Sequence, residues 1–363
     1  MSRYKICVYA ICKNEEKFVD KWVDSMSEAD LIVVADTGST DHTKDKLIAR
    51  GVHVYDISVQ PWRFDLPRNL CMDFIPEDVD ICVSTDLDEV FDPGWRKKIE
   101  AHWTPQTTRL KYSYTFGFYP DGTPIVTYAY EKIHRRHDFR WIYPVHEILE
   151  YSGSDPDVYA IDMSIHLKHF PDATKSRGQY LHLLELSAQE FPLYDRNIHY
   201  LGREYMFHHR YDEAIATLLK HLGLPTALWA DERCASMRFI SECYKVKGNL
   251  GEAIKWLYKA IGEAPYLREP YIEMAQLAYE TGDWIKGYHM ITSALTITTR
   301  TGSYLDLDSS WGYLPYDLGA ICCYQLGLYS QSLTFATEAL KLDSSSPRLQ
   351  SNYDLIKKLA VQS

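Results

Sequence analysis

The sequence lacks the features that mark membrane, secreted and cysteine-ligated metal proteins. No apolar run approaches the roughly 20 residues that a membrane-spanning helix needs. The start, "MSRYKICVYAICKNEE", shows no signal peptide, so we expect a cytoplasmic protein without a membrane span. None of the 8 cysteines forms a CxxC pair, which argues against a zinc site and favours buried free thiols.

Positive charge and phosphate-binding loops are also scarce. The formal net charge is −11, which argues against bulk nucleic-acid binding because such a surface needs clustered lysine and arginine. The sequence contains neither GxGxxG nor GxxxxGK(S/T). A dinucleotide dehydrogenase or a P-loop enzyme would therefore be without its phosphate loop. The chain also lacks the Gly-rich basic stretch that a nucleotidyltransferase usually has near its first strand.

The first half of the chain, assigned to residues 1–172, alternates short apolar runs with helical patterns. Runs rich in Val and Ile predict strands at 4–11, 29–36, 52–58 and 80–86. Between the first two, Phe18, Trp22 and Met26 recur one helical turn apart. Strands that alternate with helices predict an α/β fold with a parallel sheet covered on both faces.

The second half, assigned to residues 173–363, contains helical patterns alone. Similar helix–turn–helix segments occupy 200–225, 239–265, 271–297 and 316–343. Their turns centre on His209, Gly248, Gly282 and Gly327, at intervals of 39, 34 and 45 residues. The order of turns and small residues resembles the tetratricopeptide repeat, whose period is about 34 residues. An unrelated helical bundle is the alternative. Stacked repeats predict a surface for polypeptide or for self-association.

Polar residues follow each predicted strand of the first half. Asn14 and Glu15 follow the first strand and Asp36 ends the second, whereas Asp86 and Asp88 follow the fourth. Ligands of an open parallel sheet bind beyond the carboxyl ends of its strands. Carboxylates suit a hard cation such as Mg²⁺ or Mn²⁺, which can bridge them to the phosphates of a nucleotide.

The motifs "CKNEE", "VVADTGSTDHT", "WRFDLPRN" and "STDLDE", followed by "YPVHEILE" and "SIHLKHF", resemble the motif series of family 2 glycosyltransferases. The resemblance implies a GT-A domain, a Rossmann-like nucleotide-sugar-binding fold, followed by an all-α tetratricopeptide-like domain. The bacteriocin S-glycosyltransferases of the sublancin type have this arrangement. The resemblance covers nearly the whole chain, and it rests on the order of the motifs because a lone DxD occurs often by chance.

The resemblance assigns roles around a nucleotide-sugar donor. It implies that Asn14 and Glu15 lie by the nucleotide and that Asp36 hydrogen-bonds the uracil or ribose. Arg68 would stand near the diphosphate or the sugar. For Asp36 the alternative is helix capping, which we prefer for the neighbouring Asp41. Trp62 could form a wall for the base or sugar, or could be core packing.

The metal site follows from the same resemblance. Asp88 would be the principal ligand of Mn²⁺ or Mg²⁺, and Asp86 would contact the ribose or the metal. A late histidine completes the metal site in several GT-A families, and His166 is the first choice for that position. A structural histidine is the alternative for His166. Glu89 fits a solvated residue at the start of a helix.

Transfer to an acceptor hydroxyl or thiol with inversion also needs a general base. Glu147 is the candidate, because it follows the aromatic segment "FRWIYPV" and lies away from the DxD motif. His146 is the rival, since an imidazole titrates near neutrality. The alternative is that Glu147 pairs with an arginine such as Arg135 or Arg140.

The resulting hypothesis is a metal-dependent inverting hexosyltransferase that moves a sugar from a UDP-sugar to a peptide, a glycan or another acceptor. The alternative is a non-catalytic nucleotide-binding or tetratricopeptide interaction protein. A transferase that acts on a glycan or a modified nucleobase is a further alternative. Aromatic residues of the helical half suggest a homodimer through that half.

Overall fold

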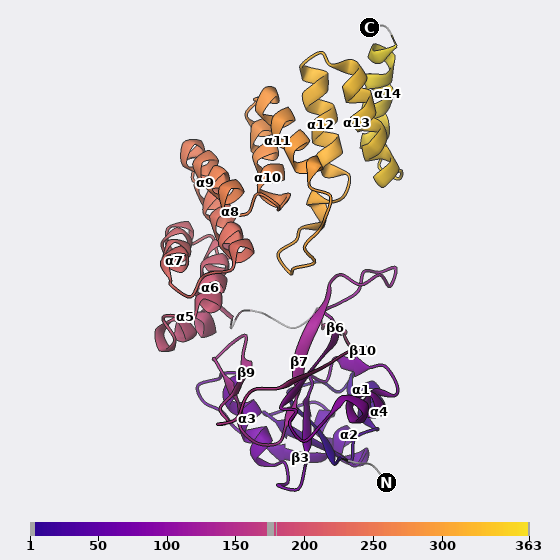
Figure 1. Ribbon diagram of the computed structural model, residues 1–363, viewed down its shortest axis with the longest axis vertical. Helices are drawn as coiled ribbons and strands as arrows, with labels where there is room; N and C mark the ends of the chain where they lie inside the picture. The colour runs from indigo at the N-terminus through magenta and orange to yellow at the C-terminus, as the bar shows by residue number, and fades with distance from the viewer. Residues whose placement is uncertain (1–3, 173–177, 179, 362–363) are drawn as a thin grey trace. The chain divides into compact units, whose positions relative to one another are not determined.

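The computed structural model describes residues 4–172, 178 and 180–361, and it divides into two compact units, Met1–Ser187 and Ala188–Ser363 (Figure 1). The sequence placed the boundary at 172/173, next to residues 173–177, which lie outside the described residues. Across the described part of the chain, no helix combines the length and the apolarity that crossing a bilayer requires.

The first unit is built on an eight-stranded sheet in the order β3-β2-β1-β4-β7-β6-β10-β5. Its strands are β1 (Ile6–Cys12), β2 (Leu31–Asp36), β3 (His53–Asp56), β4 (Ile81–Ser84), β5 (Glu89–Phe91), β6 (Arg109–Thr115), β7 (Thr127–Arg135) and β10 (Tyr159–His169). β1 pairs in parallel with β2 and β4, and β2 pairs in parallel with β3. A separate two-stranded sheet joins β8 (Phe139–Ile142) to β9 (Ile148–Tyr151).

The predicted parallel sheet is wrong beyond β4. β7 pairs antiparallel with both β4 and β6, and β5 pairs antiparallel with β10. The cause is local, because β6 and β7 are consecutive along the chain and are joined without a crossover helix, so they run in opposite directions. The fold of this unit is therefore a mixed sheet.

Alternation along β1 explains how both faces of the sheet are covered. Ile6, Val8 and Ala10 pack into one core cluster with residues of α1 (Val19–Met26), α2 (Thr43–Ala49) and α4 (Trp95–His102). Cys7 and Tyr9 face the opposite way and pack with α3 (Asp65–Asp73) and the β8–β9 pair. Successive side chains of a strand point to opposite faces, so one apolar run supplies two cores.

The second unit is all-helical. Its helices, with the one that leads into it, are α5 (Tyr180–Glu190), α6 (Asp195–Phe207), α7 (Tyr211–Gly223), α8 (Ala230–Val246), α9 (Leu250–Glu263), α10 (Glu269–Glu280), α11 (Trp284–Thr296), the 3₁₀ turn Asp308–Ser310, α12 (Leu314–Gln325), α13 (Tyr329–Leu342) and α14 (Pro347–Ala360). The pairs α6–α7, α8–α9, α10–α11 and α12–α13 correspond to the four predicted segments, and they are stacked in sequence (Figure 1). Helical repeats are thus the part of the predicted fold that holds.

The turns inside the pairs share a left-handed backbone. Gly248, Gly282 and Gly327 have φ values of 78°, 71° and 73°, and His209 occupies the matching position with φ 59°. Glycine adopts this conformation without the steric penalty that a Cβ brings. The small residue that follows each turn is buried, and a Cβ on Gly287 would lie 2.6 Å from the Cys322 sulfur. The turn glycines therefore reflect backbone conformation, whereas the small residue after each turn reflects the close approach of neighbouring helices.

Candidate functional site

The carboxyl ends of β1, β2 and β4 lie side by side in the first unit. Cys12 is in register with Asp36, and Tyr9 is in register with Ser84, two residues before Asp86. The parallel pairing therefore brings the predicted residues that follow these strands to the same edge of the sheet. The hydrogen bonds of each residue decide what it can do there.

Asp36 is used inside its own turn. Its Oδ1 accepts hydrogen bonds from the backbone N–H groups of Gly38, at 2.9 Å, and Ser39, at 2.8 Å. Burial opposes ionisation of this carboxyl, but the hydrogen bonds outweigh it and hold the pKa of Asp36 below its usual value. Its Oδ2 accepts from the Cys12 thiol at 3.3 Å. Asp36 therefore stabilises the loop, as capping would.

Asn14 and Glu15 connect the same two loops. Asn14 has φ 55°, a conformation that asparagine tolerates better than most residues, and its Oδ1 accepts from the Thr40 N–H at 2.8 Å. Its own N–H donates to Ser39 Oγ at 2.9 Å. The Glu15 N–H donates to Thr43 Oγ1 at 2.7 Å. These contacts hold the β1 loop against the β2 loop.

A buried arginine joins two predicted site residues. The Arg68 Nε donates to Glu147 Oε1 at 2.7 Å, and its Nη2 donates to Asp86 Oδ1 at 2.8 Å. Lys132 Nζ lies 3.8 Å from the other oxygen of Asp86. Burial opposes the charge on Asp86, but Arg68 and then Lys132 outweigh it and lower the pKa of Asp86 well below its usual range. Asp86 and Glu147 are thus neutralised by protein cations.

This arrangement changes the interpretation of Glu147 and His146. The arginine beside Glu147 is Arg68, whereas Arg135 pairs with Asp155 and Arg140 with Glu150. Glu147 Oε1 is therefore occupied by the Arg68 guanidinium in this structure. His146 has φ 52°, and its ring centroid lies 5.8 Å from that of Tyr180.

The histidine beside Asp88 is His169 rather than His166. His169 Nε2 lies 3.3 Å from Asp88 Oδ2, and its Nδ1 lies 2.8 Å from the Phe116 carbonyl oxygen. That carbonyl can only accept, so Nδ1 carries a proton. Burial alone would lower the pKa of His169, but the hydrogen bond and charge of Asp88 raise it. His166 instead contacts Thr115 Oγ1 at 2.7 Å and lies 3.5 Å from Asp92.

Sheet register explains why His169 and Lys132 were missed. His169 pairs with Glu89 across the antiparallel β5–β10 contact, which brings it next to Asp88. His166 and His169 are three residues apart on one strand, so they point to opposite faces. Lys132, on β7, is 7% exposed beside Asp86, and an inward lysine within a β-pattern is the signal that could have found it.

The remaining residues fit a cation only in part. Glu89 Oε2 accepts the Asp86 N–H at 2.9 Å, and burial raises the pKa of Glu89. Trp62 packs edge-on against Phe64, with ring centroids 5.4 Å apart. Asp88 differs from Asp86 because its ionic partner is the His169 imidazole instead of a guanidinium or an ammonium group. A mixed oxygen and nitrogen pair suits Mn²⁺ better than Mg²⁺, which prefers oxygen.

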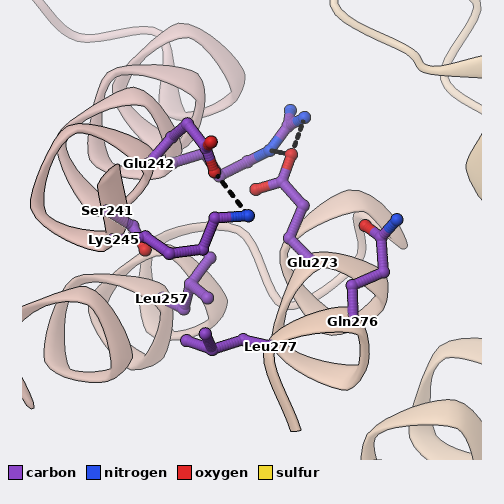
Figure 2. Close-up of a pocket in the computed structure, with 8 residues that line it drawn as sticks. Ser241, Glu242, Lys245, Leu257, Glu273, Gln276 and Leu277 are labelled. Atoms are coloured by element: carbon purple, nitrogen blue, oxygen red, sulfur yellow. Dashed lines mark hydrogen bonds and ion pairs between the residues drawn. The ribbon is translucent and has the colours of Figure 1, made fainter. Parts of the chain in front are cut away.

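A second candidate site is a polar pocket in the helical unit, between α8 and α10 (Figure 2). Its lining residues are Arg238, Ser241, Glu242, Lys245, Leu257, Glu273, Gln276 and Leu277. Arg238 Nε donates to Glu273 Oε1 at 2.9 Å across the two helices. Lys245 Nζ lies 3.1 Å from Glu242 and 3.5 Å from Glu280. Positive and negative groups thus alternate along the pocket.

No family model and no curated protein matches the chain. Similar solved structures include the MamA protein, at 15% identity over 45% of this chain and 81% of that chain with a TM-score of 0.36. They also include PilW, a widely conserved type IV pilus biogenesis factor, at 14% identity over 48% and 74% with a TM-score of 0.40. A third is a thermophilic TPR protein of Thermus thermophilus, at 16% identity over 49% and 91% with a TM-score of 0.35.

These comparisons contradict the predicted family 2 glycosyltransferase, its GT-A fold class and its enzymatic activity. The similar structures are tetratricopeptide-repeat proteins rather than glycosyltransferases, and they give no support to a hexosyltransferase. The UDP-sugar donor, the sugar acceptor and the interpretation of the DxD motif are likewise without support. The first unit offers a physical reason, because Arg68 pairs with Asp86 and Glu147, and backbone N–H groups donate to Asp36. The motif series is therefore compatible with internal structure.

Proposed function

We propose that the chain is a non-catalytic interaction protein whose helical unit binds a polypeptide segment between α8 and α10. The polar pocket between these helices carries the proposal. One wall of the pocket comes from α8, where Arg238, Glu242 and Lys245 recur at helical spacing. The facing wall comes from α10, with Glu273 and Gln276. Residues at i, i+4 and i+7 share one helix face, so the three α8 side chains line the pocket from the same side.

The chemistry of the pocket suits a peptide backbone with mixed side chains. Lys245 and Gln276 can donate to carbonyl oxygens, whereas Glu242 and Glu273 can accept from N–H groups. The pocket also contains Leu257 and Leu277, each 3% exposed, which offer limited apolar contact. Because donors and acceptors alternate, an uncharged or mixed-charge segment is favoured over a strongly acidic or basic one.

A peptide selection tests this proposal. The full chain would be used to select from a displayed random-peptide library, and the affinity of enriched peptides would be measured by fluorescence anisotropy. Lys245→Ala combined with Gln276→Ala should weaken binding at least about tenfold, which corresponds to about 1.4 kcal/mol. Lys255→Ala on α9 is the matched control, since its side chain is exposed and outside the pocket. Failure to enrich any peptide, or equal affinities for both variants, would contradict the proposal.

A second proposal concerns the first unit, which we infer binds a divalent cation, and with it a nucleotide, without catalysis. It rests on Asp88 Oδ2 and His169 Nε2, which lie 3.3 Å apart. A bound Mn²⁺ would supply positive charge for a phosphate group. In an electron paramagnetic resonance titration, binding to the wild-type protein should reduce the signal of free Mn²⁺. Asp88→Asn should leave that signal undiminished, with and without UDP. Asp45→Asn is the control because Asp45 is exposed. Equal Mn²⁺ uptake by both variants would refute this site.

Self-association through the helical unit is a separate proposal. Phe207, Leu228 and Ile285 are 59%, 81% and 63% exposed in that unit. A second copy would remove such apolar surface from water. Light scattering of the full chain at micromolar concentration should give twice the monomer mass. A monomer under those conditions would exclude a stable homodimer.

A further inference from the structure

The first repeat contains a cluster of metal-ligand atoms that neither proposal above uses. Asp195 is the first residue of α6, His221 lies in the last turn of α7, and Glu232 lies in the first turn of α8. One ligand atom from each lies within 4.8 Å of the other two. His221 is 0% exposed and Glu232 is 4% exposed. Three different helices thus converge on one buried point.

A hydrogen bond holds the Nδ1 atom of the His221 imidazole in place. Its Nδ1 lies 2.9 Å from Ser236 Oγ, and the same hydroxyl lies 2.7 Å from His199 Nδ1. A hydroxyl has one proton, so Ser236 donates to one ring and accepts from the other. When it accepts from His221 Nδ1–H, the Nε2 of His221 carries a lone pair directed away from Ser236. A hydrogen bond to the other ring nitrogen is the usual support of a metal-bound histidine.

The other ring nitrogen, His221 Nε2, lies buried beside a carboxylate. Within the described residues this buried atom makes no well-directed hydrogen bond, and its polar neighbour is Glu232 Oε1, 3.3 Å away, with which a protonated His221 would form an ion pair. A charge-assisted hydrogen bond would be shorter, at roughly 2.7–2.9 Å. Two ligands on a tetrahedral zinc ion, each about 2.0–2.1 Å from the metal, stand roughly 3.3 Å apart. The spacing is therefore also that of two ligands of one ion.

The second oxygen of Glu232 is also oriented. Glu232 Oε2 accepts a hydrogen bond from the Tyr304 hydroxyl at 2.8 Å, and Tyr304 belongs to the insertion between α11 and α12. This contact leaves Oε1 to face His221. Asp195 is only partly buried, so its carboxylate lies on the side from which an ion can enter. The ligand set contains no cysteine, and for this reason cysteine spacing could not reveal it.

We propose that Asp195, His221 and Glu232 bind a zinc ion that fastens α6, α7 and α8 together. One imidazole nitrogen and two carboxylates leave a fourth tetrahedral position for water. The ion neutralises two carboxylates that would otherwise repel each other. Its function is structural, and it is independent of the peptide pocket and of the cation proposed at Asp88.

Zinc competition against a chromophoric chelator tests the site in the full chain, first stripped of metal. We expect wild-type protein to take up one tightly held equivalent and to unfold at a higher temperature with zinc. His221→Gln and Glu232→Gln should each weaken this affinity at least about tenfold and remove the thermal shift. His289→Gln, which removes an exposed histidine of α11, should leave both unchanged. Asp88→Asn should still bind one equivalent of zinc, which would show that this zinc does not bind at the site of the first unit.

Asp195→Asn keeps the test decisive if a buried variant fails to fold, because Asp195 is only partly buried at a helix start. It should lower zinc affinity while leaving the metal-free thermal transition near that of wild type. Cobalt substitution should give the intense visible bands of tetrahedral Co²⁺, and these bands should be lost in Asp195→Asn. Absence of zinc uptake by wild-type protein, or unchanged uptake in Asp195→Asn, would overturn the proposal.

Discussion

Arg68 Nε donates a 2.7 Å hydrogen bond to Glu147, 79 residues later in the chain, and the same guanidinium donates from Nη2 to Asp86. The side chains of Arg68 and Glu147 are 5% and 11% exposed. The guanidinium therefore ties α3 to the end of β4 and to the segment before β9. Two carboxylates that the sequence suggested for chemistry are held together by one cation.

Arg68→Met should destabilise the first unit strongly. Removing one partner of a buried ion pair leaves an uncompensated charge, and such losses are about 3–5 kcal/mol. We expect a fall of that size in the free energy of unfolding, measured by urea denaturation. Adding Glu147→Gln to Arg68→Met should recover part of the loss, because it removes one uncompensated charge. Arg140→Met is the control, since Arg140 pairs with Glu150 at an exposed position. A loss below about 1 kcal/mol for Arg68→Met would contradict this account.

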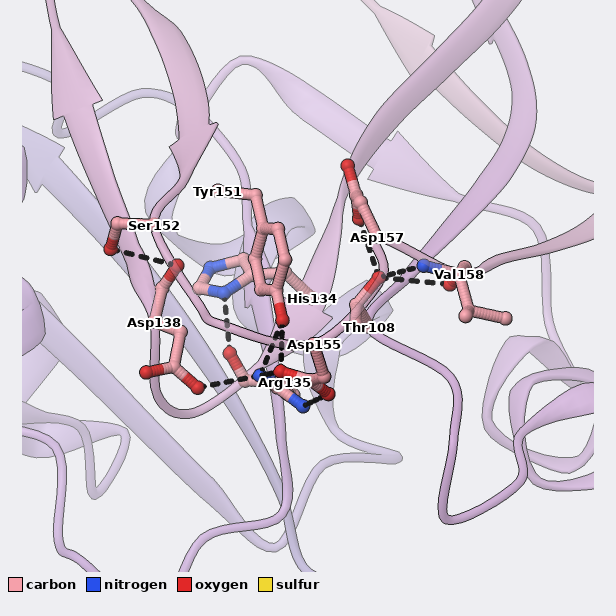
Figure 3. A network of polar contacts seen from close by, with 9 residues as sticks. All are labelled: Thr108, His134, Arg135, Asp138, Tyr151, Ser152, Asp155, Asp157 and Val158. Carbon is pink, nitrogen blue, oxygen red and sulfur yellow. Dashed lines mark hydrogen bonds and ion pairs between the residues drawn. The ribbon is translucent and has the colours of Figure 1, made fainter.

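His134 makes the first unit sensitive to acid. It is fully buried, and its Nδ1 donates to the Arg135 carbonyl at 2.7 Å (Figure 3). Its Nε2 lies 2.9 Å from the Tyr9 hydroxyl. Tyr9 in turn accepts from the Trp141 indole N–H at 2.9 Å, so its own proton points to His134. Burial lowers the pKa of His134 to about 3. The folded protein therefore keeps this ring neutral.

The sign of the pH effect follows from that shift. Above the ordinary histidine pKa of about 6.5, neither the folded nor the unfolded chain protonates this ring, and the contribution to stability is complete. Between about 6.5 and 3 the unfolded chain binds a proton that the folded chain does not, so stability falls with falling pH. His134→Gln should reduce the slope of unfolding free energy against pH by up to about 1.4 kcal/mol per unit. His42→Gln, at an exposed position, should leave the slope unchanged. Parallel curves for wild type and His134→Gln would refute the assignment.

Local patterns predicted the parts of the fold that local chemistry controls. The helix pairs follow from left-handed turns at Gly248, Gly282 and Gly327 and from small residues where helices meet. β1, β2, β3 and β4 follow from short apolar runs. By contrast, the place of β10 between β6 and β5 depends on pairing between residues far apart in sequence, which no local pattern encodes.

In the candidate site too, local sequence and long-range contacts have to be distinguished. The sequence proposed the loop residues Asn14, Asp36 and Asp88 as site residues, but it could not show which groups surround them. His169 rather than His166 faces Asp88 because of the β5–β10 register, and Glu147 meets Arg68 only in the folded chain. Which charges neutralise each other is a tertiary property. The motif series therefore suggested a family and an activity that the comparisons contradict.

Gly287→Ala should disturb the contact between α11 and α12. The added Cβ would lie 2.6 Å from Cys322 Sγ, closer than packed atoms can stand, and Cys322 is itself buried. Overpacking of this kind destabilises by about 1–3 kcal/mol. Gly262→Ala on α9 is the matched control, because a Cβ there meets no atom within 4 Å. It should stabilise its helix by up to about 1 kcal/mol. Equal thermal transitions for the two variants would show that α12 moves away without strain.

His209→Gly should stabilise the first repeat. His209 occupies with φ 59° the turn position that glycine takes at 248, 282 and 327, and a left-handed residue with a Cβ carries a penalty of about 1–2 kcal/mol. Glycine removes that penalty but adds conformational entropy to the unfolded chain, so the expected net gain is below about 1 kcal/mol. The variant also loses the contact of His209 Nδ1 with the Tyr211 hydroxyl, at 2.8 Å. This contact is exposed, so its loss should lower the stability only slightly.

The reciprocal change separates backbone strain from side-chain contacts. Gly248→His introduces the same side chain at φ 78°, where the added Cβ meets no atom within 4 Å, so the Cβ itself causes no clash and the change tests the left-handed backbone. Gly248→His should lower the thermal transition of the full chain, and His209→Gly should raise it. Because the two turns are equivalent, the shifts should be opposite in sign. A lower transition for His209→Gly would mean that the contact with Tyr211 outweighs the strain of the left-handed turn.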